Sequence, residues 1–148
     1  MPSTHVSLSY HIVFSTKNRD PLIANHWRNR LHNMLGGCIR TAGGTSLQIG
    51  GTSDHVHLLA GLRATHCVAD FVRDVKRATS AWVHDTLRIA RFGWQEGYGA
   101  FTVSPYDCSG LVNYIRTQEE HHRRRTFPDE YREFLERHEI EFDERYLW

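Results

Sequence analysis

The sequence predicts an α+β fold: a ferredoxin-like (RRM-like) four-stranded antiparallel sheet with two helices on one face and further helices at the C-terminal end. The hydrophobic pattern gives the order strand, helix, strand, strand, helix, strand, and then helices. Because crossovers between parallel strands are right-handed, this order folds most simply into such a sheet. With 148 residues and 40% hydrophobic content, the chain has enough apolar residues for one core. We therefore expect one domain over residues 1–148, with the second sheet face free.

The first strand and the first helix are indicated by two different periodicities. Hydrophobic and polar residues alternate strictly over residues 5–15, as in a half-buried strand. The polar side of this strand, which includes His5 and His11, should point to the free face of the sheet. Hydrophobic residues then recur at helical spacing over residues 23–39, until Gly43 ends the pattern. This second pattern predicts the first helix.

A hairpin and a second helix follow. Two short strand-like runs, residues 45–50 and 55–62, are joined by the turn-forming residues 51–54. Residues 68–83 have the spacing of an amphipathic helix, and its polar face carries several basic side chains. The hairpin should supply the second and third strands of the sheet, and the helix should pack on it.

The C-terminal third contains one more strand and two predicted helices. A fourth strand is expected at residues 100–103, after a loop rich in glycine and aromatic residues. Ser104-Pro105 offers an N-cap followed by proline, which is typical of a helix start. We expect this third helix to continue to about Arg124 and a short fourth helix to span residues 129–138.

The charge is distributed unevenly along the chain. The formal net charge is +1, but residues 126–148 hold eight acidic and three basic side chains, a balance of −5. The first 125 residues hold nine acidic and fifteen basic side chains, a balance of +6. Such a cationic body could attract phosphate, although charged helix faces are often only solvated. The candidate phosphate contacts are Arg73, Lys76, Arg77, Arg123, Arg124 and Arg125.

The sequence also indicates where in the cell the protein is expected to be. No apolar stretch approaches the length needed to cross a bilayer, and the N-terminus lacks the pattern of a signal peptide. We therefore expect a cytoplasmic protein that does not enter a membrane. The three cysteines are odd in number and widely spaced, which favours reduced thiols over a disulfide framework.

The pair His55-Val56-His57 is the sharpest local motif. Residues two apart on a strand project to the same face, with alpha carbons about 6.5 Å apart, so both imidazoles could bind one cation. Val56 has the opposite parity and can fill the core. With eleven histidines in the chain, however, about one such pair is expected by chance.

Two imidazoles hold a catalytic metal poorly, and the predicted third helix offers further ligands. Tyr114 and Gln118 are four residues apart and share a helix face, while His121 and His122 lie just beyond. A phenol one turn before an amide ligand would place a nucleophile beside the metal. The alternative is an ordinary amphipathic helix with a solvent-facing charged end.

Five segments that span nearly the whole chain resemble a known family. They are YHIVFSTKNR, SDHVHLL, GYGAFTVS, YIRTQEEHH and FDERYLW, in this order. The sequence is similar to the single-tyrosine transposases of the His-hydrophobic-His (HUH) superfamily, which include the insertion sequence two hundred group and the REP-associated tyrosine transposases. The resemblance implies that His55 and His57 are metal ligands, Gln118 is the third ligand and Tyr114, on the C-terminal helices, is the nucleophile.

The resemblance also implies a mechanism and partners. It implies DNA transposition, in which a tyrosine cleaves and rejoins single-stranded DNA through a covalent 5′-phosphotyrosine. A divalent metal, Mg²⁺ or Mn²⁺, would offset the cost of ionising a phenol at neutral pH, about 4 kcal/mol. The expected partners are hairpin-forming single-stranded DNA and a second copy of the chain, in a homodimer.

Two other functions compete with this interpretation. A non-catalytic module that binds single-stranded DNA or RNA could have the same fold, but such modules usually display aromatic residues on the open sheet face. Here the first strand shows serines and histidines on that face. A metal oxygenase would need a carboxylate as third ligand, which Gln118 is not. Asp54 adjoins His55 but should face the opposite way.

Overall fold

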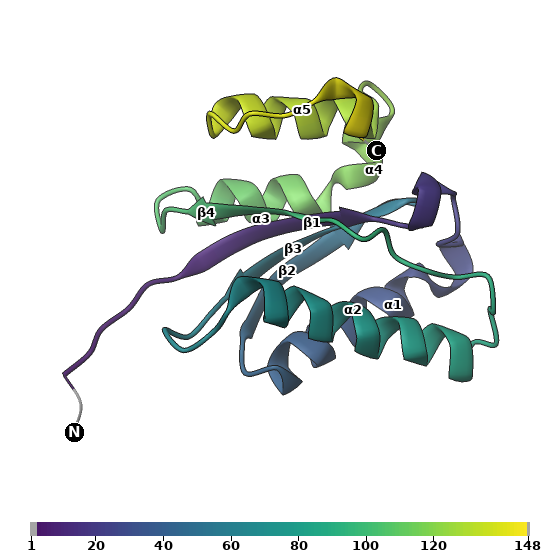
Figure 1. Cartoon of the computed structure of the whole chain (residues 1–148), viewed down its shortest axis with the longest axis horizontal. Helices are drawn as coiled ribbons and strands as arrows, with labels where there is room; N and C mark the ends of the chain where they lie inside the picture. Colours follow the sequence, from purple (N-terminus) through teal and green to yellow (C-terminus); the bar gives the residue numbers. More distant parts are fainter. Residues whose placement is uncertain (1–2, 148) are drawn as a thin grey trace.

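A four-stranded antiparallel sheet separates two layers of helices in the computed structural model, which describes residues 3–147 (Figure 1). The strands lie in the order β2-β3-β1-β4. They are β1 (Ser9–Ser15), β2 (Thr45–Gly51), β3 (His55–Gly61) and β4 (Gly99–Val103). One helix layer contains α1 (Asn25–Thr41) and α2 (Val68–Asp85), and the other contains α3 (Cys108–Arg116), α4 (Gln118–His122) and α5 (Phe127–Arg137). Two short 3-10 helices are η1 (Lys17–Arg19) and η2 (Glu144–Tyr146). The ferredoxin-like α+β prediction is confirmed.

The larger core lies between the sheet and the layer of α1 and α2. Ile12 and Phe14 of β1 and Val56 and Leu58 of β3 are fully or almost fully buried there. They have the alternating parity predicted for these strands, and the hydrophobic stripes of α1 and α2 cover them. The next residues along each strand must therefore point to the opposite face.

That opposite face is covered, so the prediction of a free sheet face was wrong. Helix α5 buries Phe127, Tyr131 and Leu135, which form a second core with Val13 and Phe101 of the sheet. The three α5 residues recur every four positions, which gives the helix a hydrophobic stripe that must be buried. Within the part of the chain that the structure describes, no helix is both long and apolar enough to span a membrane.

The predicted third helix is interrupted, and α4 follows α3 after a single residue. Thr117 separates them with non-helical backbone angles, φ −105° and ψ 30°. Its hydroxyl donates to the carbonyl of Asn113 at 2.9 Å, a local bond that bends helices. Ser104-Pro105 belongs to a turn rather than to the helix, which begins only at Cys108. The expected single helix to Arg124 was therefore wrong.

Two other boundaries differ slightly from expectation. The first strand begins at Ser9, because its pairing with β3 and with β4 ends there. Helix α5 begins at Phe127 rather than at residue 129. The hydroxyl of Thr126 caps it by accepting from the backbone N–H of Asp129, and a proline lies in the first turn.

Close packing holds α3 against the edge strand β2. A Cβ atom at Gly50 would overlap the backbone carbonyl of Ile115, so only glycine allows this approach. Ile115 itself is fully buried. This contact sets the height of α3 above the sheet and therefore the position of Tyr114, one residue earlier.

Candidate metal centre and tyrosine site

The paired histidines of β3 point to the sheet face covered by the C-terminal helices. Both His55 and His57 are fully buried, and Val56 between them faces the other core. The expected parity is therefore present, but the imidazoles lie under α4 and α5 instead of on an open surface. On that face the imidazoles contact the rings of Phe127 and Phe134 as well as polar side chains of α4 and α5. They do not enter the hydrophobic core between the sheet and α1.

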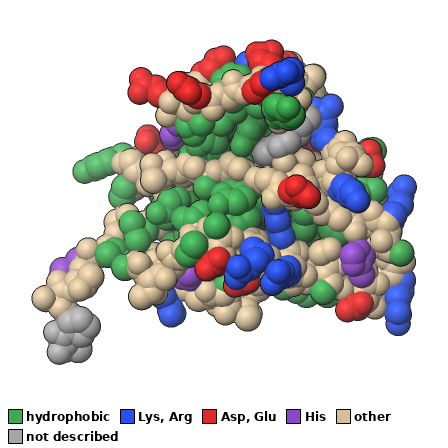
Figure 2. Space-filling model, in the orientation of Figure 1, with side chains coloured by type: hydrophobic (Ala, Val, Ile, Leu, Met, Phe, Trp, Pro, Cys, Tyr) green, Lys and Arg blue, Asp and Glu red, His purple; other side chains and the backbone are tan. Residues whose placement is uncertain are grey.

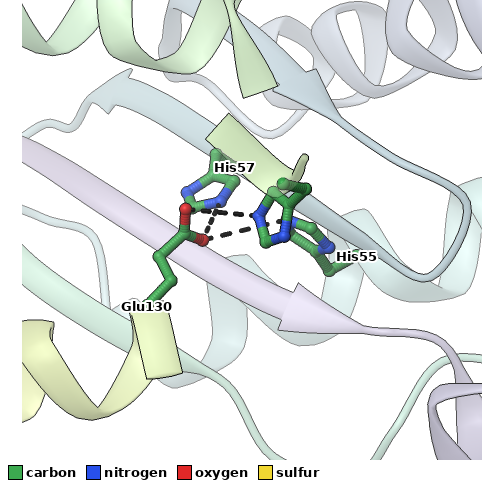
Figure 3. A group of neighbouring side chains, drawn as sticks. His55, His57 and Glu130 are labelled. Atoms are coloured by element: carbon green, nitrogen blue, oxygen red, sulfur yellow. Dashed lines mark hydrogen bonds and ion pairs between the residues drawn. The ribbon is translucent and has the colours of Figure 1, made fainter. Parts of the chain in front are cut away.

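Four side chains form a cluster that could hold a metal ion: His55, His57, His122 and Glu130, called here the metal cluster. One ligand atom from each lies within 4.8 Å of all the others. Figure 3 shows the two β3 imidazoles and the Glu130 carboxylate pointing toward one another. Oε1 of Glu130 lies 2.9 Å from Nε2 of His57, and Oε2 lies 3.3 Å from Nε2 of His122.

Gln118, the predicted third ligand, borders this cluster. Its Oε1 atom lies 3.1 Å from Nε2 of His55 and 3.1 Å from Nε2 of His122. The side chain is 1% exposed. Three imidazole nitrogens, one carboxylate and one amide oxygen therefore converge, a donor set that suits a divalent first-row metal. The residues present fit the metal that the resemblance implied.

Outer contacts orient both β3 imidazoles through their second ring nitrogens. Nδ1 of His55 lies 2.8 Å from Oδ1 of Asp54, and Nδ1 of His57 lies 2.8 Å from Nε2 of His11. Such partners fix the tautomer and the ring orientation of metal-binding histidines. Asp54 lies just before β3 and contacts the His55 ring on the side away from the cluster, so the expectation that it faces the opposite way was wrong.

The phenol of Tyr114 reaches the same cluster. Its hydroxyl donates a short hydrogen bond to Oε2 of Glu130. The ring centroid lies 6.0 Å from that of His57. A single chain therefore brings together the tyrosine, the paired histidines and Gln118, the four residues singled out from the sequence.

The electrostatics of the site depend mainly on Glu130. Burial alone would raise the pKa of this carboxyl, but hydrogen bonds from His122, His57 and Tyr114 outweigh it and hold the pKa far below its usual range. Burial and the Glu130 charge raise the pKa of the Tyr114 phenol above its usual value. Burial has the opposite effect on an imidazole and lowers the pKa of His57, although the Glu130 carboxylate opposes this shift. An ionised carboxylate thus faces a neutral phenol.

Sequence reasoning missed Glu130, and it mentioned His122 without assigning it a role. Glu130 had a detectable signal, because an acidic residue stands on the hydrophobic side of a helix between Phe127 and Phe134. Buried carboxylates on such a face are usually paired or bound to metal. Gln118 is indeed not a carboxylate, but Glu130 places one beside the paired histidines.

The predicted basic contacts fall into two groups. The side chains on α2 lie in the helix layer on the other side of the sheet from the cluster. Arg73 pairs with Asp70 and Asp74, and Lys76 donates to the carbonyls of residues 95–97. Arg77 is exposed on the same helix. Arg123, Arg124 and Arg125 are exposed beside the cluster, in the α4–α5 connection.

A groove leads from the surface to the tyrosine. It has a volume of about 690 Å³ and lies between α3 and α5, with Tyr114, Glu130 and His11 among its lining residues. Arg125 also lines it. The solvent side of α5 carries acidic and basic side chains, among them Asp129, Glu136 and Arg137, and Figure 2 shows red and blue side chains along its top. Phosphate would therefore meet a cation at only part of this rim.

Comparison with known proteins identifies a family for this chain. A profile of the family described as "Transposase IS200 like" matches residues 4–118. A crystal structure of a protein assigned as a transposase from Deinococcus radiodurans R1 is 26% identical, with a TM-score of 0.61, and the match covers 78% of this chain and 93% of that one. The comparison with curated proteins found no match.

A second solved structure shares the fold. It is a REP-associated tyrosine transposase bound to a REP hairpin, 13% identical, with a TM-score of 0.56, and the match covers 78% of this chain and 68% of that one. This second likeness shows the fold alone, whereas the family match defines the molecule as a transposase. The chain belongs to the IS200-like transposase family.

The family match ends at Gln118, the residue that borders the metal cluster. His122 and Glu130 lie beyond it, in α4 and α5. The paired histidines, the tyrosine and the glutamine thus fall within the family's segment, whereas the additional imidazole and the carboxylate come from the following segment of this chain.

Proposed function

We propose that this transposase cleaves and rejoins single-stranded DNA with Tyr114 as its nucleophile, beside a divalent metal held by the metal cluster and Gln118. The observation that carries the proposal is the hydrogen bond from the Tyr114 hydroxyl to Glu130, whose other oxygen contacts His57. A nucleophile and a set of metal ligands thus share one carboxylate.

The ligand set favours manganese over magnesium. Mg²⁺ prefers an octahedron of oxygen atoms and is reluctant to lose water, whereas imidazole nitrogens suit Mn²⁺ and later metals better. With His122 the cluster contains three imidazoles rather than two. A bound cation would polarise the scissile phosphate and stabilise the charge that develops there.

Covalent catalysis divides the reaction into two steps. The phenol oxygen of Tyr114 attacks phosphorus, the bond from phosphorus to the tyrosine forms, and the bond to the 3′ oxygen breaks. Glu130, which already accepts the phenol hydrogen bond, takes the proton. The proton finally resides on the released 3′-hydroxyl, so atoms and charges balance. Because the pKa of Glu130 is low, this carboxylate holds the proton only transiently.

The second step reverses the first with a different strand. The 5′-phosphotyrosine retains the energy of the original phosphodiester. A 3′-hydroxyl of another strand attacks it, the bond between phosphorus and Tyr114 breaks, and the phenol recovers its proton. Transposition requires strand joining as well as cleavage, and this second step joins strands without a nucleotide cofactor.

The substrate must gain access to a covered site. His55, His57 and Gln118 are at most 1% exposed, and Glu130 is 2% exposed. The groove between α3 and α5 reaches Tyr114 and Glu130, but a phosphate reaches the two β3 imidazoles only if α5 shifts from its position over the sheet. The exposed residues Arg123–Arg125 lie at the connection that must move, so they are the proposed contacts for an approaching strand. The REP-bound structure supports a hairpin-forming substrate, and the α2 residues remain a weaker proposal.

The proposed chemistry does not depend on a homodimer. The phenol and the metal cluster come from one chain, so a second subunit is not required to complete the site. The homodimer remains a prediction from the family resemblance. A non-catalytic RNA-binding module is disfavoured, because α3–α5 cover the sheet face that such modules use.

A labelled hairpin with a single-stranded flank tests the proposal when incubated with Mn²⁺ or Mg²⁺. The natural chain should form a covalent adduct that survives denaturing electrophoresis, and Tyr114→Phe should form none. His57→Ala should need far more metal or form no adduct. Tyr146→Phe is the matched control, because Tyr146 is 75% exposed and does not line the groove that leads to Tyr114. Cleavage by Tyr114→Phe at the natural rate would show that the nucleophile is elsewhere.

A further inference from the structure

A second groove lies at the β2 edge of the sheet, and Gln118 but not Tyr114 is among its lining residues. It has a volume of about 500 Å³ and is bounded by α1, by β2 and by α3 with α4, and it is called here the β2-edge groove. Gln118 lines this groove and also contacts His55 and His122 of the metal cluster. A ligand in the groove would therefore lie directly beside the metal cluster.

Three arginines from different elements line the β2-edge groove: Arg28 of α1, Arg116 of α3 and Arg123 after α4. Two acidic residues, Glu119 and Glu120, line it as well. Glu119 is engaged by Arg28 in an ion pair at 2.5 Å. Among residues 3–147, neither Arg116 nor Arg123 takes part in an ion pair, and both are exposed. Arg116 donates one hydrogen bond, to Oδ1 of Asn113 at 2.7 Å, and the remaining N–H groups of the two guanidinium groups are available to an anion.

Two nitrogen atoms in the α1 wall also lack partners. Nε of Arg28 and Nε2 of His32 are buried and have no hydrogen-bond partner among the described residues. These residues are one helical turn apart, on the same side of α1. Buried polar groups are almost always hydrogen-bonded, so the Nε–H donor of Arg28 indicates an acceptor that the described residues do not supply. Nε2 of His32 can join it as a second donor when its ring adopts the matching tautomer. Phosphate oxygens are strong acceptors for such donors.

We propose that the β2-edge groove binds a backbone phosphate of the DNA strand, adjacent to the phosphate that Tyr114 attacks. This inference rests on the proposed function, because it assigns the neighbouring subsite of the same substrate. Arg116 and Arg123 neutralise the phosphate, and the α1 wall supplies further donors. The contact holds the strand in register and carries no base information, as is usual for phosphate contacts.

Binding of a labelled oligothymidylate, measured by fluorescence anisotropy in the presence of a chelator, tests the subsite without any catalysis. The double variant Arg116→Gln/Arg123→Gln should bind roughly tenfold more weakly, and the salt dependence of log K should fall by about 0.7 for each lost contact. Asn29→Asp, which adds a negative charge to an exposed residue of the groove, should also weaken binding.

The matched control is Arg40→Gln/Arg63→Gln. It removes the same charge from two exposed arginines that do not line the β2-edge groove, and its affinity should change less than twofold. Thermal melting checks that each variant is folded, which is expected because all four arginines are exposed. Equal losses in the two double variants, or an unchanged affinity and salt slope in Arg116→Gln/Arg123→Gln, would overturn the proposal.

The outcome of this binding experiment can be distinguished from the outcome of the experiment that tests Tyr114 as the nucleophile. If the natural chain binds the oligonucleotide through the groove but forms no covalent adduct with metal, the cleavage mechanism fails and the phosphate subsite stands. If the adduct forms and the groove variants bind normally, the subsite fails and the mechanism stands. No binding of single strands by the natural chain would overturn both.

Discussion

Nε2 of His11 lies 2.8 Å from Nδ1 of His57, and the two buried rings are stacked with centroids 5.0 Å apart. The contact directs Nε2 of His57 toward Glu130. Burial and the neighbouring His57 keep the pKa of His11 well below its usual value, so His11 is neutral. It therefore acts as a hydrogen-bond partner that fixes one tautomer of the His57 ring, a proposed metal ligand.

His11→Phe should weaken metal binding. The substitution keeps a ring of similar shape but removes the partner of Nδ1 of His57, and loss of such outer contacts costs about 10–100-fold in metal affinity. Titration with Mn²⁺, followed by electron paramagnetic resonance, measures the change. His26→Asn is the control, because His26 is exposed on α1. An unchanged dissociation constant in His11→Phe would mean that the stacked pair is only a packing contact.

Glu130→Gln should impair both metal binding and adduct formation. The amide removes the negative charge that faces His57 and His122. Loss of a partner that only orients a ligand costs about 10–100-fold in metal affinity, so the affinity should fall at least tenfold here. Calorimetric titration with Mn²⁺ gives the affinity. Glu133→Gln, one turn later on α5, removes the same charge from a residue paired only with arginines. If both variants bind metal alike, Glu130 is not a ligand.

Gly50→Ala should destabilise the fold and displace the tyrosine helix. The new methyl group would overlap the carbonyl of Ile115, and such overpacking costs about 1–3 kcal/mol or more. Urea denaturation measures the loss, and adduct formation should fall with it. Gly110→Ala is the matched substitution in α3 itself, where a Cβ meets nothing within 4 Å. That variant should be stabilised by up to about 1 kcal/mol, so equal effects at the two positions would contradict the packing argument.

His32 should make stability depend on pH in a defined window. Burial, and secondly the charge of Arg28, lower the pKa of this imidazole from 6.5 to about 4. Between these values the unfolded chain binds a proton that the folded chain does not, so the free energy of unfolding decreases as pH falls. The full loss is on the order of 3 kcal/mol.

Urea denaturation at pH values above and below this window checks the prediction for His32. His32→Gln cannot take up the proton, so its stability should decline less than that of the natural chain as the pH is lowered. His26→Gln, which alters an exposed histidine one and a half turns away, should follow the natural chain. Parallel pH profiles for the natural chain and His32→Gln would show that His32 is solvated and titrates normally.

The local pattern was sufficient for the sheet, for α1 and α2, and for the parity of the paired histidines. Alternation over β1 and β3 assigns each side chain to a face, so His55 and His57 had to lie opposite Val56. The spacing of Tyr114 and Gln118 predicted that both could serve one site, and both do contact the metal cluster. These inferences succeeded because they depend only on neighbours within one strand or one helix.

Tertiary structure alone decided what covers the second sheet face and which residues complete the site. Glu130 lies 73 residues from His57 in sequence, and the contact exists only because α5 folds back over β1 and β3. The break at Thr117 also redirects the chain, so that His122 and not His121 joins the cluster. Periodicity shows that one face of a helix such as α5 is hydrophobic and must be buried. It does not show which surface covers that face, because many hydrophobic surfaces could pack against it.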